Sequence, residues 1–368
     1  MRVKLKDITK FSKGTQINGK NLIDDGAYSY LNGGIKPSGK WNEFNVAENT
    51  VTISEGGNSS GYVNYMNEAF WCGAHCYYLY DGPKNSKYLY YALKSQQERL
   101  FRIRSGACMP NIKKSDLGNF IIEYEEDETR QEEVVKVLEK CELLIEDYNK
   151  KLVLLDEAVR ARFVEMFGTL HDNENRFNIV TIEEVCSIIK DGTHQTPHYT
   201  EDKINGYKFL SSKDVMSQKI NWENIKYIPK DLHEKLYASI QPQRNDILMS
   251  KNGVNYGVAA VNDTDEVFDI YVSLALLRPK QLIDPVFFRC VINNIETKRQ
   301  FDMSIKGIGV PNLHLGEIKK TKIILPPMVL QKQFVTFVKQ IDKSRSRIQK
   351  SLEASQELFD SLMQEYFG

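Results

Sequence analysis

The feature that most constrains this chain is a repeat, because residues 130–168 align with residues 330–368 at a constant offset of 200. Both copies carry a glutamine near the start, Gln131 and Gln331, and both end in Phe-Gly. A spacing of this length is too long for the unit of a solenoid. The sequence instead predicts two copies of a two-part module, in which a globular lobe is followed by a long helix.

Apolar residues in both copies recur in alternating steps of three and four, which is the heptad pattern of a coiled coil. The series begins at Val134 in the first copy and at Phe334 in the second. A seam this narrow needs a partner helix, and an antiparallel pairing of the two copies would make the chain pseudo-two-fold symmetric. Arg345 and Ser355 are polar positions of the second seam, so we expect them to fix the register of the helices.

The segments before the helices have a mixed pattern. Short β-type runs at 50–54 and 246–250 each lead into a glycine-rich turn, and helices are expected near 86–102 and 285–305. We therefore predict an α+β fold with two α/β domains, separated by two long helices that form an antiparallel coiled coil. The predicted boundaries are 1–122 for the first domain, 123–170 for the first helix, 171–325 for the second domain and 326–368 for the second helix.

Composition narrows the class of protein. The first residues lack the apolar core of a signal peptide, and no run approaches the ~18 apolar residues of a membrane span. The six cysteines are scattered rather than arranged as a disulfide framework. We therefore expect a reduced, cytoplasmic protein.

The net charge of zero hides an uneven distribution. Residues 1–120 carry 16 lysines and arginines against 10 acidic residues, whereas residues 121–170 carry 7 against 14. Residues 171–325 balance at 20 of each sign. A basic first lobe is typical of nucleic-acid binding, while the acidic helix is expected to face solvent rather than phosphates.

Catalytic signatures are largely missing. The sequence has no Gly-x-x-x-x-Gly-Lys-Ser/Thr loop and no Gly-x-Gly-x-x-Gly opening a helix after a strand. The phrase Cys72-Gly-Ala-His75-Cys76 could supply metal ligands, but a second close pair of ligands is absent, so we expect no metal site. The glycine-rich turns at 55–61 and 251–257 are most typical of tight hairpins, and their short polar neighbours support the alternative of loops that bind phosphates.

Several phrases follow one another along the chain in a specific arrangement. They are YSYLNGG at 28–34, ISEGGNS at 53–59, FWCGAHC at 70–76, DGTHQTP at 191–197, LPPMVLQ at 325–331 and LMQEYFG at 362–368. Together with the doubled helix, they resemble the DNA-specificity (S) subunit of type I restriction-modification systems. The resemblance covers essentially the whole chain.

The resemblance implies two target-recognition domains that each read one half of a bipartite, asymmetric DNA site, with the helices as a spacer. It implies a non-catalytic scaffold that recruits two methyltransferase (M) subunits and the restriction/motor (R) subunits. No cofactor is expected on this chain, because S-adenosylmethionine and ATP would bind the partner subunits. The second lobe has no net charge, whereas a DNA-binding domain is expected to be basic.

The residues expected to contact bases or phosphates are short polar or cationic groups near turns. They are Lys36, Ser38, Lys40, Glu55, Asn58, Ser59 and His75 in the first lobe, and Thr193, His194, Thr196, Lys213, Lys251 and Asn252 in the second. His194 on its own is more typical of an ordinary turn histidine than of a ligand or base. Two other functions stay open on the sequence: a coiled-coil adaptor that binds only protein, and a nuclease or methyltransferase with a divergent active site.

Overall fold

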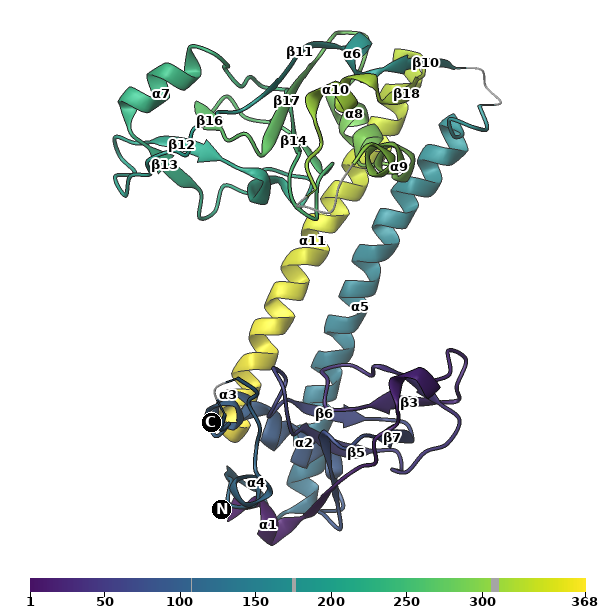
Figure 1. The fold of residues 1–368 in the computed structure, drawn as a ribbon, viewed down its shortest axis with the longest axis vertical. Helices are drawn as coiled ribbons and strands as arrows, with labels where there is room; N and C mark the ends of the chain where they lie inside the picture. The colour runs from purple at the N-terminus through teal and green to yellow at the C-terminus, as the bar shows by residue number, and fades with distance from the viewer. Residues whose placement is uncertain (107, 174–176, 306–310) are drawn as a thin grey trace. The chain divides into compact units, whose positions relative to one another are not determined.

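The computed structural model describes residues 1–106, 108–173, 177–305 and 311–368. Its contacts divide the chain into two compact units, one made of residues 1–151 and 348–368 and the other of residues 152–347. Two helices of 40 residues, α5 (Glu128–Phe167) and α11 (Met328–Phe367), contribute to both units (Figure 1). The two long helices that the repeat predicts are therefore confirmed.

The first lobe, residues 1–127, precedes α5. Its elements are β1 (Arg2–Lys4), α1 (Leu5–Ile8), β2 (Lys10–Lys13), η1 (Gly19–Asn21), β3 (Tyr28–Leu31), β4 (Gly39–Trp41), β5 (Thr50–Ser54), β6 (Val63–Met66), β7 (Phe70–Cys72), β8 (Cys76–Tyr80), α2 (Ser86–Ser95), α3 (Gln97–Arg102), α4 (Lys114–Gly118) and β9 (Ile121–Glu123).

The second lobe, residues 168–327, lies between the two long helices in the chain. Its elements are β10 (Asn178–Thr181), α6 (Ile182–Val185), β11 (Cys186–Asp191), β12 (Tyr207–Leu210), η2 (Ser212–Val215), β13 (Lys226–Ile228), α7 (Lys230–Tyr237), β14 (Ile247–Ser250), β15 (Ala259–Val261), β16 (Phe268–Ile270), β17 (Leu274–Pro279), α8 (Pro285–Ile292), α9 (Ile295–Ser304), α10 (Leu315–Lys320) and β18 (Lys322–Leu325).

The two lobes have the same sheet topology. Each has a four-stranded antiparallel sheet, in the order β2-β8-β5-β6 or β11-β17-β14-β15. Each also has a three-stranded sheet with one parallel pair, in the order β4-β3-β7 or β13-β12-β16. A two-stranded ribbon, β1-β9 or β10-β18, joins the start of each lobe to its end. The lobes are thus two copies of one α/β frame, which confirms the predicted fold class.

Helices lie at both expected places, and each expected range holds two of them. The helix expected at 86–102 is divided into α2 and α3 at Gln96, which leaves the helical conformation and donates from Nε2 to the carbonyl of Phe367 (2.9 Å). The helix expected at 285–305 is divided into α8 and α9, because the Asn294 side chain accepts from the Glu296 N–H (3.0 Å) and caps a new helix. Periodicity alone does not reveal either break, since the apolar pattern continues across it.

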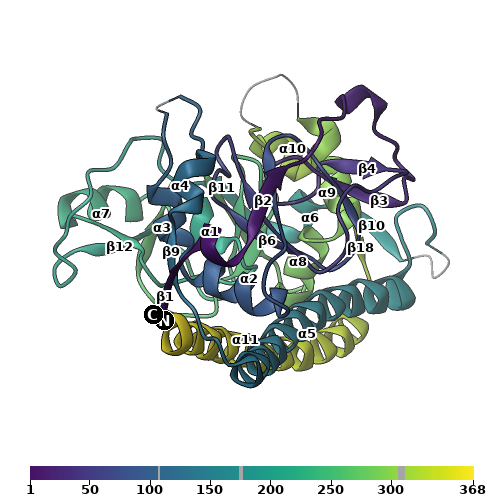
Figure 2. The ribbon, with the colours of Figure 1, turned by 90° about the horizontal axis from the view of Figure 1, so that it is seen from below.

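The first core is completed by helical residues from distant parts of the chain. Val134 and Leu138 of α5 and Phe367 of α11 are buried with the sheet residues of the first lobe. The rings of Tyr88 and Phe367 have centroids 5.2 Å apart. Figure 2 shows α2, which carries Tyr88, against the long helices. The start of α5 therefore packs beside the end of α11.

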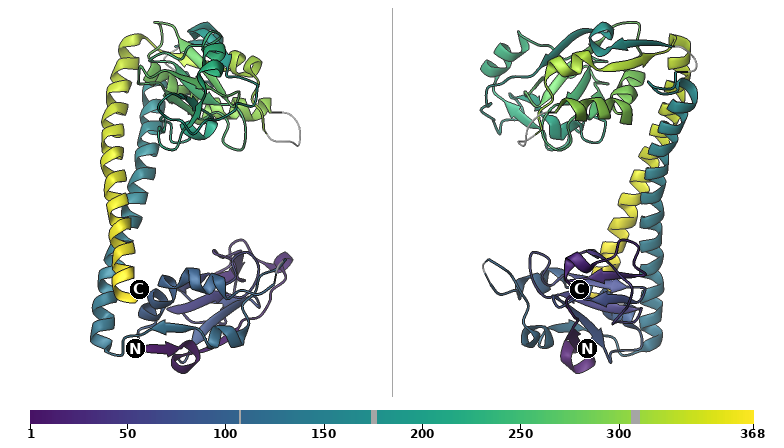
Figure 3. Two further views of the ribbon diagram at one scale, coloured as in Figure 1. Left: turned by 90° about the vertical axis from the view of Figure 1, so that its left-hand side faces the viewer. Right: turned by 45° about the vertical axis from the view of Figure 1, so that its right-hand side comes forward.

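The second core has the opposite pairing of helix ends. Phe163 and Phe167 near the end of α5 contact Phe334 near the start of α11, with centroids 5.6 and 5.5 Å apart. Phe287 of α8 contacts all three rings. Both views of Figure 3 show the end of α5 beside the start of α11 in this unit. The two helices therefore run antiparallel, as the sequence predicts.

The repeated glutamines are buried at the start of both long helices. Gln131 donates from Nε2 to the carbonyl of Glu125 (2.6 Å). Gln331 donates to the carbonyls of Pro326 (2.8 Å) and Leu282 (3.1 Å) and accepts from the Asp284 N–H (2.8 Å). A buried amide must find such partners, so this position of the repeat holds the incoming chain against the helix.

The polar seam positions lie where the heptads place them. Arg345 donates from Nη2 to Asp156 Oδ1 of α5 at 2.7 Å, within the second unit. Ser355 is half-buried on α11 in the first unit. Their role in helix register stays a prediction. None of the helices in the described ranges is both long enough and apolar enough to cross a membrane.

Replacing the buried amide should destabilise the second unit. Gln331→Ala removes three hydrogen bonds and leaves the Asp284 N–H and the carbonyls of Leu282 and Pro326 without this partner. We expect a loss of about 2–4 kcal/mol in the free energy of unfolding, measured by urea denaturation followed by circular dichroism. Gln333→Ala, at an exposed position two residues away, is the matched control and should cost less than about 0.5 kcal/mol. Equal midpoints for the two variants would contradict this role.

Candidate functional site

Three turns of the first lobe, residues 32–38, 55–62 and 73–75, are joined to one another. Together with Lys13 and Arg104, which contact them, they form what we call the first loop cluster. Ser59 Oγ donates to the carbonyl of Gly33 at 2.5 Å, which ties the first turn to the second. The Glu55 N–H donates to the carbonyl of His75 (2.8 Å), and the His75 N–H donates to Asn32 Oδ1 (3.3 Å). The structure thus brings the predicted residues Glu55, Ser59 and His75 together, and Asn32, 43 positions before His75, joins them.

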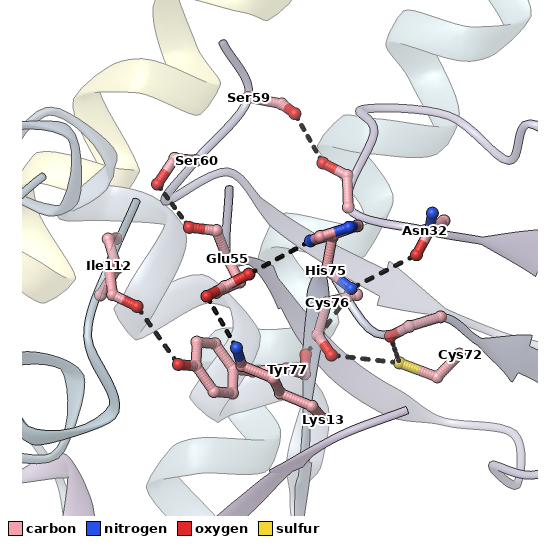
Figure 4. Close-up of polar contacts among 12 residues, drawn as sticks. Lys13, Asn32, Glu55, Ser59, Ser60, Cys72, His75, Cys76, Tyr77 and Ile112 are labelled. Atoms are coloured by element: carbon pink, nitrogen blue, oxygen red, sulfur yellow. Dashed lines mark hydrogen bonds and ion pairs between the residues drawn. The ribbon is translucent and has the colours of Figure 1, made fainter. Parts of the chain in front are cut away.

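Glu55 is the centre of this cluster (Figure 4). Its Oε1 accepts from Lys13 Nζ at 2.7 Å, and its Oε2 lies 3.4 Å from His75 Nδ1. Its backbone carbonyl accepts from Ser60 Oγ (2.8 Å) and from the Ile112 N–H (2.9 Å). Both carboxylate oxygens are therefore engaged, and only 15% of the side chain is exposed.

The second lobe has an equivalent cluster, the second loop cluster: residues 191–196, 211–213, 251–258 and 270–273. The Thr193 N–H donates to the carbonyl of Ile270 (3.0 Å), and the Lys251 N–H donates to the carbonyl of Ser273 (2.8 Å). The Ser273 hydroxyl accepts from the Ser212 N–H at 3.0 Å, next to Lys213. The end of β16 and the residues after it therefore contact Thr193, Lys251 and the residue before Lys213.

The central ion pair occupies equivalent places in the two lobes with its charges reversed. In the first lobe Lys13 ends β2 and Glu55 follows β5. In the second lobe Asp191 ends β11 and Lys251 follows β14, and Lys251 Nζ lies 2.6 Å from Asp191 Oδ2. His194 Nε2 lies 3.5 Å from the same Asp191 oxygen. Each cluster thus contains one carboxylate between a lysine and a histidine.

Burial distinguishes the two pairs. The side chain of Lys251 is 6% exposed, whereas that of Lys13 is 44% exposed. Removing one partner of a buried ion pair leaves an uncompensated charge, while a solvated pair contributes little. The pair of the second lobe is therefore a structural element of its turn.

The geometry gives three of the predicted contact residues partners within the fold. Lys251 is buried with its ammonium on Asp191, so it is not available to bases or phosphates in this structure. Glu55 has both oxygens occupied, and Ser59 uses its hydroxyl on Gly33. These side chains hold the clusters together, because a short polar group near a turn finds its partner within the fold.

The remaining predicted residues differ in exposure, and their contacts with a ligand stay predictions. The exposed ones are Lys36, Ser38, Lys40, Asn58, His75, His194, Thr196 and Lys213. Thr193 and Asn252 are half-buried, and the Oδ1 atom of Asn252 is buried without a partner among the described residues.

Sequence reasoning missed several residues of the clusters. Lys13 and Asp191 each stand directly before a Gly-Thr phrase, a signal present in both lobes that marks the paired position. Arg104 donates from Nη1 to the carbonyl of Asn58 (3.3 Å), and no local signal announces that contact. Val254, at the tip of the second glycine turn, is 83% exposed. The sequence alone does not show whether an apolar residue in such a turn is buried or exposed.

The two cysteines that could have supplied metal ligands in the first lobe lie in strands. Cys72 and Cys76 are buried, and Cys72 Sγ lies 3.4 Å from the carbonyl of Cys76. The neighbouring Cys76 thiol and burial both raise the pKa of Cys72, which disfavours the thiolate that binds metals. Across the part of the chain that the structure describes, no three metal-binding side chains gather at one place.

A buried carboxylate and histidine lie beside the second cluster. His233 Nδ1 is 2.7 Å from Asp269 Oδ2, and the ring of Tyr207 stacks on His233 with centroids 3.6 Å apart. Burial raises the pKa of Asp269. A cavity of about 370 Å³ borders this place and is lined by Asp269 together with Asp191, Gly192, Thr193 and His194. The stacked ring indicates that the pair packs α7 against the sheet.

Comparisons with known proteins identify the family of this frame. The sequence profile described as type I restriction modification DNA specificity domain matches residues 1–154 and 174–356. A provisionally named type I specificity subunit of Mycoplasma pneumoniae is 35% identical over 169 residues, which is 45% of this chain and 44% of that protein. Another provisionally named one, from Mycoplasma genitalium, is 26% identical over 96% of this chain and 90% of its own length.

A solved structure has the same fold. The crystal structure of the S subunit of a type I restriction-modification system from M. genitalium matches with a TM-score of 0.67 at 20% identity. The match covers 100% of this chain and 96% of that one. At this level of identity the likeness concerns the fold alone.

Removing the counter-charge of Lys251 should open the second cluster. Asp191→Asn leaves a buried ammonium unpaired. We therefore expect the free energy of opening of the turn, as read from hydrogen exchange, to fall by about 3 kcal/mol. The equivalent Glu55→Gln in the first lobe should cost less than about 1 kcal/mol, because its partners are more exposed. Hydrogen exchange measured by mass spectrometry on peptides covering 248–258 and 52–62 reads both effects.

The matched control is the double variant Asp191→Asn/Lys251→Met, which removes both charges and keeps the aliphatic volume. We expect it to recover most of the protection lost in the single variant, since no charge stays buried. Equal protection in wild type and Asp191→Asn would show that the pair does not hold the turn.

Proposed function

Because the chain belongs to the family of type I restriction-modification DNA specificity domains, we propose that it selects the DNA sequence on which a methyltransferase and restriction complex acts. Each lobe reads one half of a bipartite, asymmetric site, and the antiparallel helices set the interval between the halves. The family match favours this function over a protein-only adaptor and over an enzyme with a divergent active site.

One observation carries the proposal. The two lobes keep one frame of strands and backbone hydrogen bonds, while the side chains on equivalent turns differ in kind and even in the sign of their charge. A protein that reads two unlike half-sites needs two similar supports with different groups at the DNA. Exposed Lys36 and Lys40 are suited to phosphates, and exposed Asn58 is suited to a base edge.

The proposal assigns the chemistry to partner subunits. Two methyltransferase subunits and the restriction subunits bind this chain, and they hold S-adenosylmethionine and ATP. The chain itself serves as a non-catalytic scaffold in the cytoplasm, where the DNA is. Partners can supply phosphate contacts, which accounts for a second lobe without net charge.

Exchange of one lobe should change one half of the recognised site. We expect a chimaera with residues 1–127 from another specificity subunit to alter one half-site and leave the other intact, when the complex with the methyltransferase is assayed by sequencing of modified bases. Replacement of residues 168–327 is the reciprocal control and should alter the other half. If either chimaera changed both halves or neither, the assignment of one half to each lobe would be wrong.

Lengthening both helices should widen the interval between the half-sites. One heptad inserted after Lys150 and another after the equivalent Lys350 adds about 10 Å at ~1.5 Å per residue. We expect an interval longer by about three base pairs at ~3.4 Å per base pair, with both half-sites unchanged, in the same assay. An insertion in one helix alone mismatches the seam and should reduce methylation. An unchanged interval in the double insertion would contradict a spacer role.

A further inference from the structure

The glycine turns that follow β5 and β14 have the same backbone frame at an offset of 196. The Gly57 N–H donates to the carbonyl of Pro110 (2.9 Å), and the Gly253 N–H donates to the carbonyl of Pro311 (3.0 Å). Gly61 bonds back to Ser54 and Gly257 bonds back to Ser250, both at 2.8 Å. The residues at the tips, Asn58 and Val254, are therefore held in equivalent places.

A glycine with a positive φ angle precedes each tip residue. Gly57 and Gly253 have φ angles of 78° and 84°, which a residue with a side chain rarely adopts, and a Cβ at either would meet nothing within 4 Å. Glycine is required here by the backbone conformation and not by lack of space. The residue after each glycine lies at the outer end of the turn. Asn58 is exposed, and Val254 is 83% exposed.

The exposed valine is an isolated apolar group in a polar turn. Its neighbours Asn252 and Asn255 are polar, and Lys251 is held inward on Asp191. Single exposed apolar side chains are common, but a protein-binding surface needs a contiguous patch of several hundred Å². A single valine side chain at the tip of a turn is complementary to a ligand that carries one small apolar group among polar groups.

We propose that the tip residue of each glycine turn determines base specificity, with Val254 against the C5-methyl group of a thymine and Asn58 against the edge of an adenine. The inference rests on the proposed function. In the major groove the thymine methyl is the apolar group that distinguishes base pairs, and asparagine pairs with adenine N6 and N7. The frame common to both turns presents two chemistries to two half-sites.

Deoxyuridine in place of thymidine tests Val254, because it removes the methyl group and keeps the base pairing. The complex of the chain with its methyltransferase is titrated with DNA substituted at one thymine of the second half-site at a time. We expect one position at which the wild type loses affinity about fourfold, the factor for about 0.8 kcal/mol per buried methylene-sized group. The Val254→Ser complex should bind both DNAs equally at that position.

Ile204→Ser is the matched control, because Ile204 is an apolar residue of the same lobe that is 93% exposed and lies outside the cluster. It should keep the wild-type ratio. A wild type that is indifferent to deoxyuridine at every thymine would overturn the assignment of Val254. So would a Val254→Ser variant that weakens binding of the methyltransferase subunit and leaves the ratio unchanged. If the wild-type complex methylated no bipartite site, the proposed function itself would fail, which is a distinct result.

A modified adenine tests Asn58 in the same way. 7-Deazaadenine lacks the N7 acceptor, so we expect the wild-type complex to lose about fivefold or more in affinity at one adenine of the first half-site, within the range of a bidentate contact. The Asn58→Val complex should be indifferent there, and it should favour DNA that has thymine at that position over DNA that has deoxyuridine. An Asn58→Val complex with unchanged base preference would overturn the role of the tip residue in the first lobe.

Discussion

Each lobe of this protein is closed by turns of two helices that come from distant parts of the chain. The rings of Phe163, Phe167 and Phe334 complete the core of the second unit, and Phe367 completes that of the first. Full burial of an aromatic side chain contributes on the order of 1.5–3 kcal/mol. Because these residues lie at the helix ends, helix pairing and lobe folding are coupled, and the first unit joins residues 1–151 to residues 348–368.

The duplicated frame separates support from recognition. Strand order, the glycine turns and the backbone bonds to Pro110 and Pro311 are shared by the lobes. The side chains on that frame have diverged as far as the reversal of an ion pair, Lys13 with Glu55 against Asp191 with Lys251. An ion pair can be reversed at one place because attraction depends on opposite signs and not on which strand carries which sign. The turns could therefore change their surfaces while their geometry stayed the same.

Sequence patterns predicted the elements that depend on local periodicity. The heptads located α5 and α11, and the β-type run at 50–54 is β5 as expected. The pattern failed at Gln96 and Asn294, where side chains interrupt a helix by binding a backbone group. It also assigned Glu55 and Lys251 to a ligand, although each is engaged by a residue 42 or 60 positions away. Spacing in the chain gives no measure of such pairings.

The sequence by itself determined the repeat, the antiparallel helices, the family and the turns that carry the candidate site, because these follow from periodicity, glycine positions and local phrases. Only the tertiary structure decided which polar residues are consumed in holding the loop clusters and which project outward. Burial and ion pairing are properties of groups brought together by folding, so Lys251 is internal and Val254 is exposed. That inversion of the usual preference of lysine and valine is the reason that the proposed base contact lies at the tip of the turn and not at Lys251.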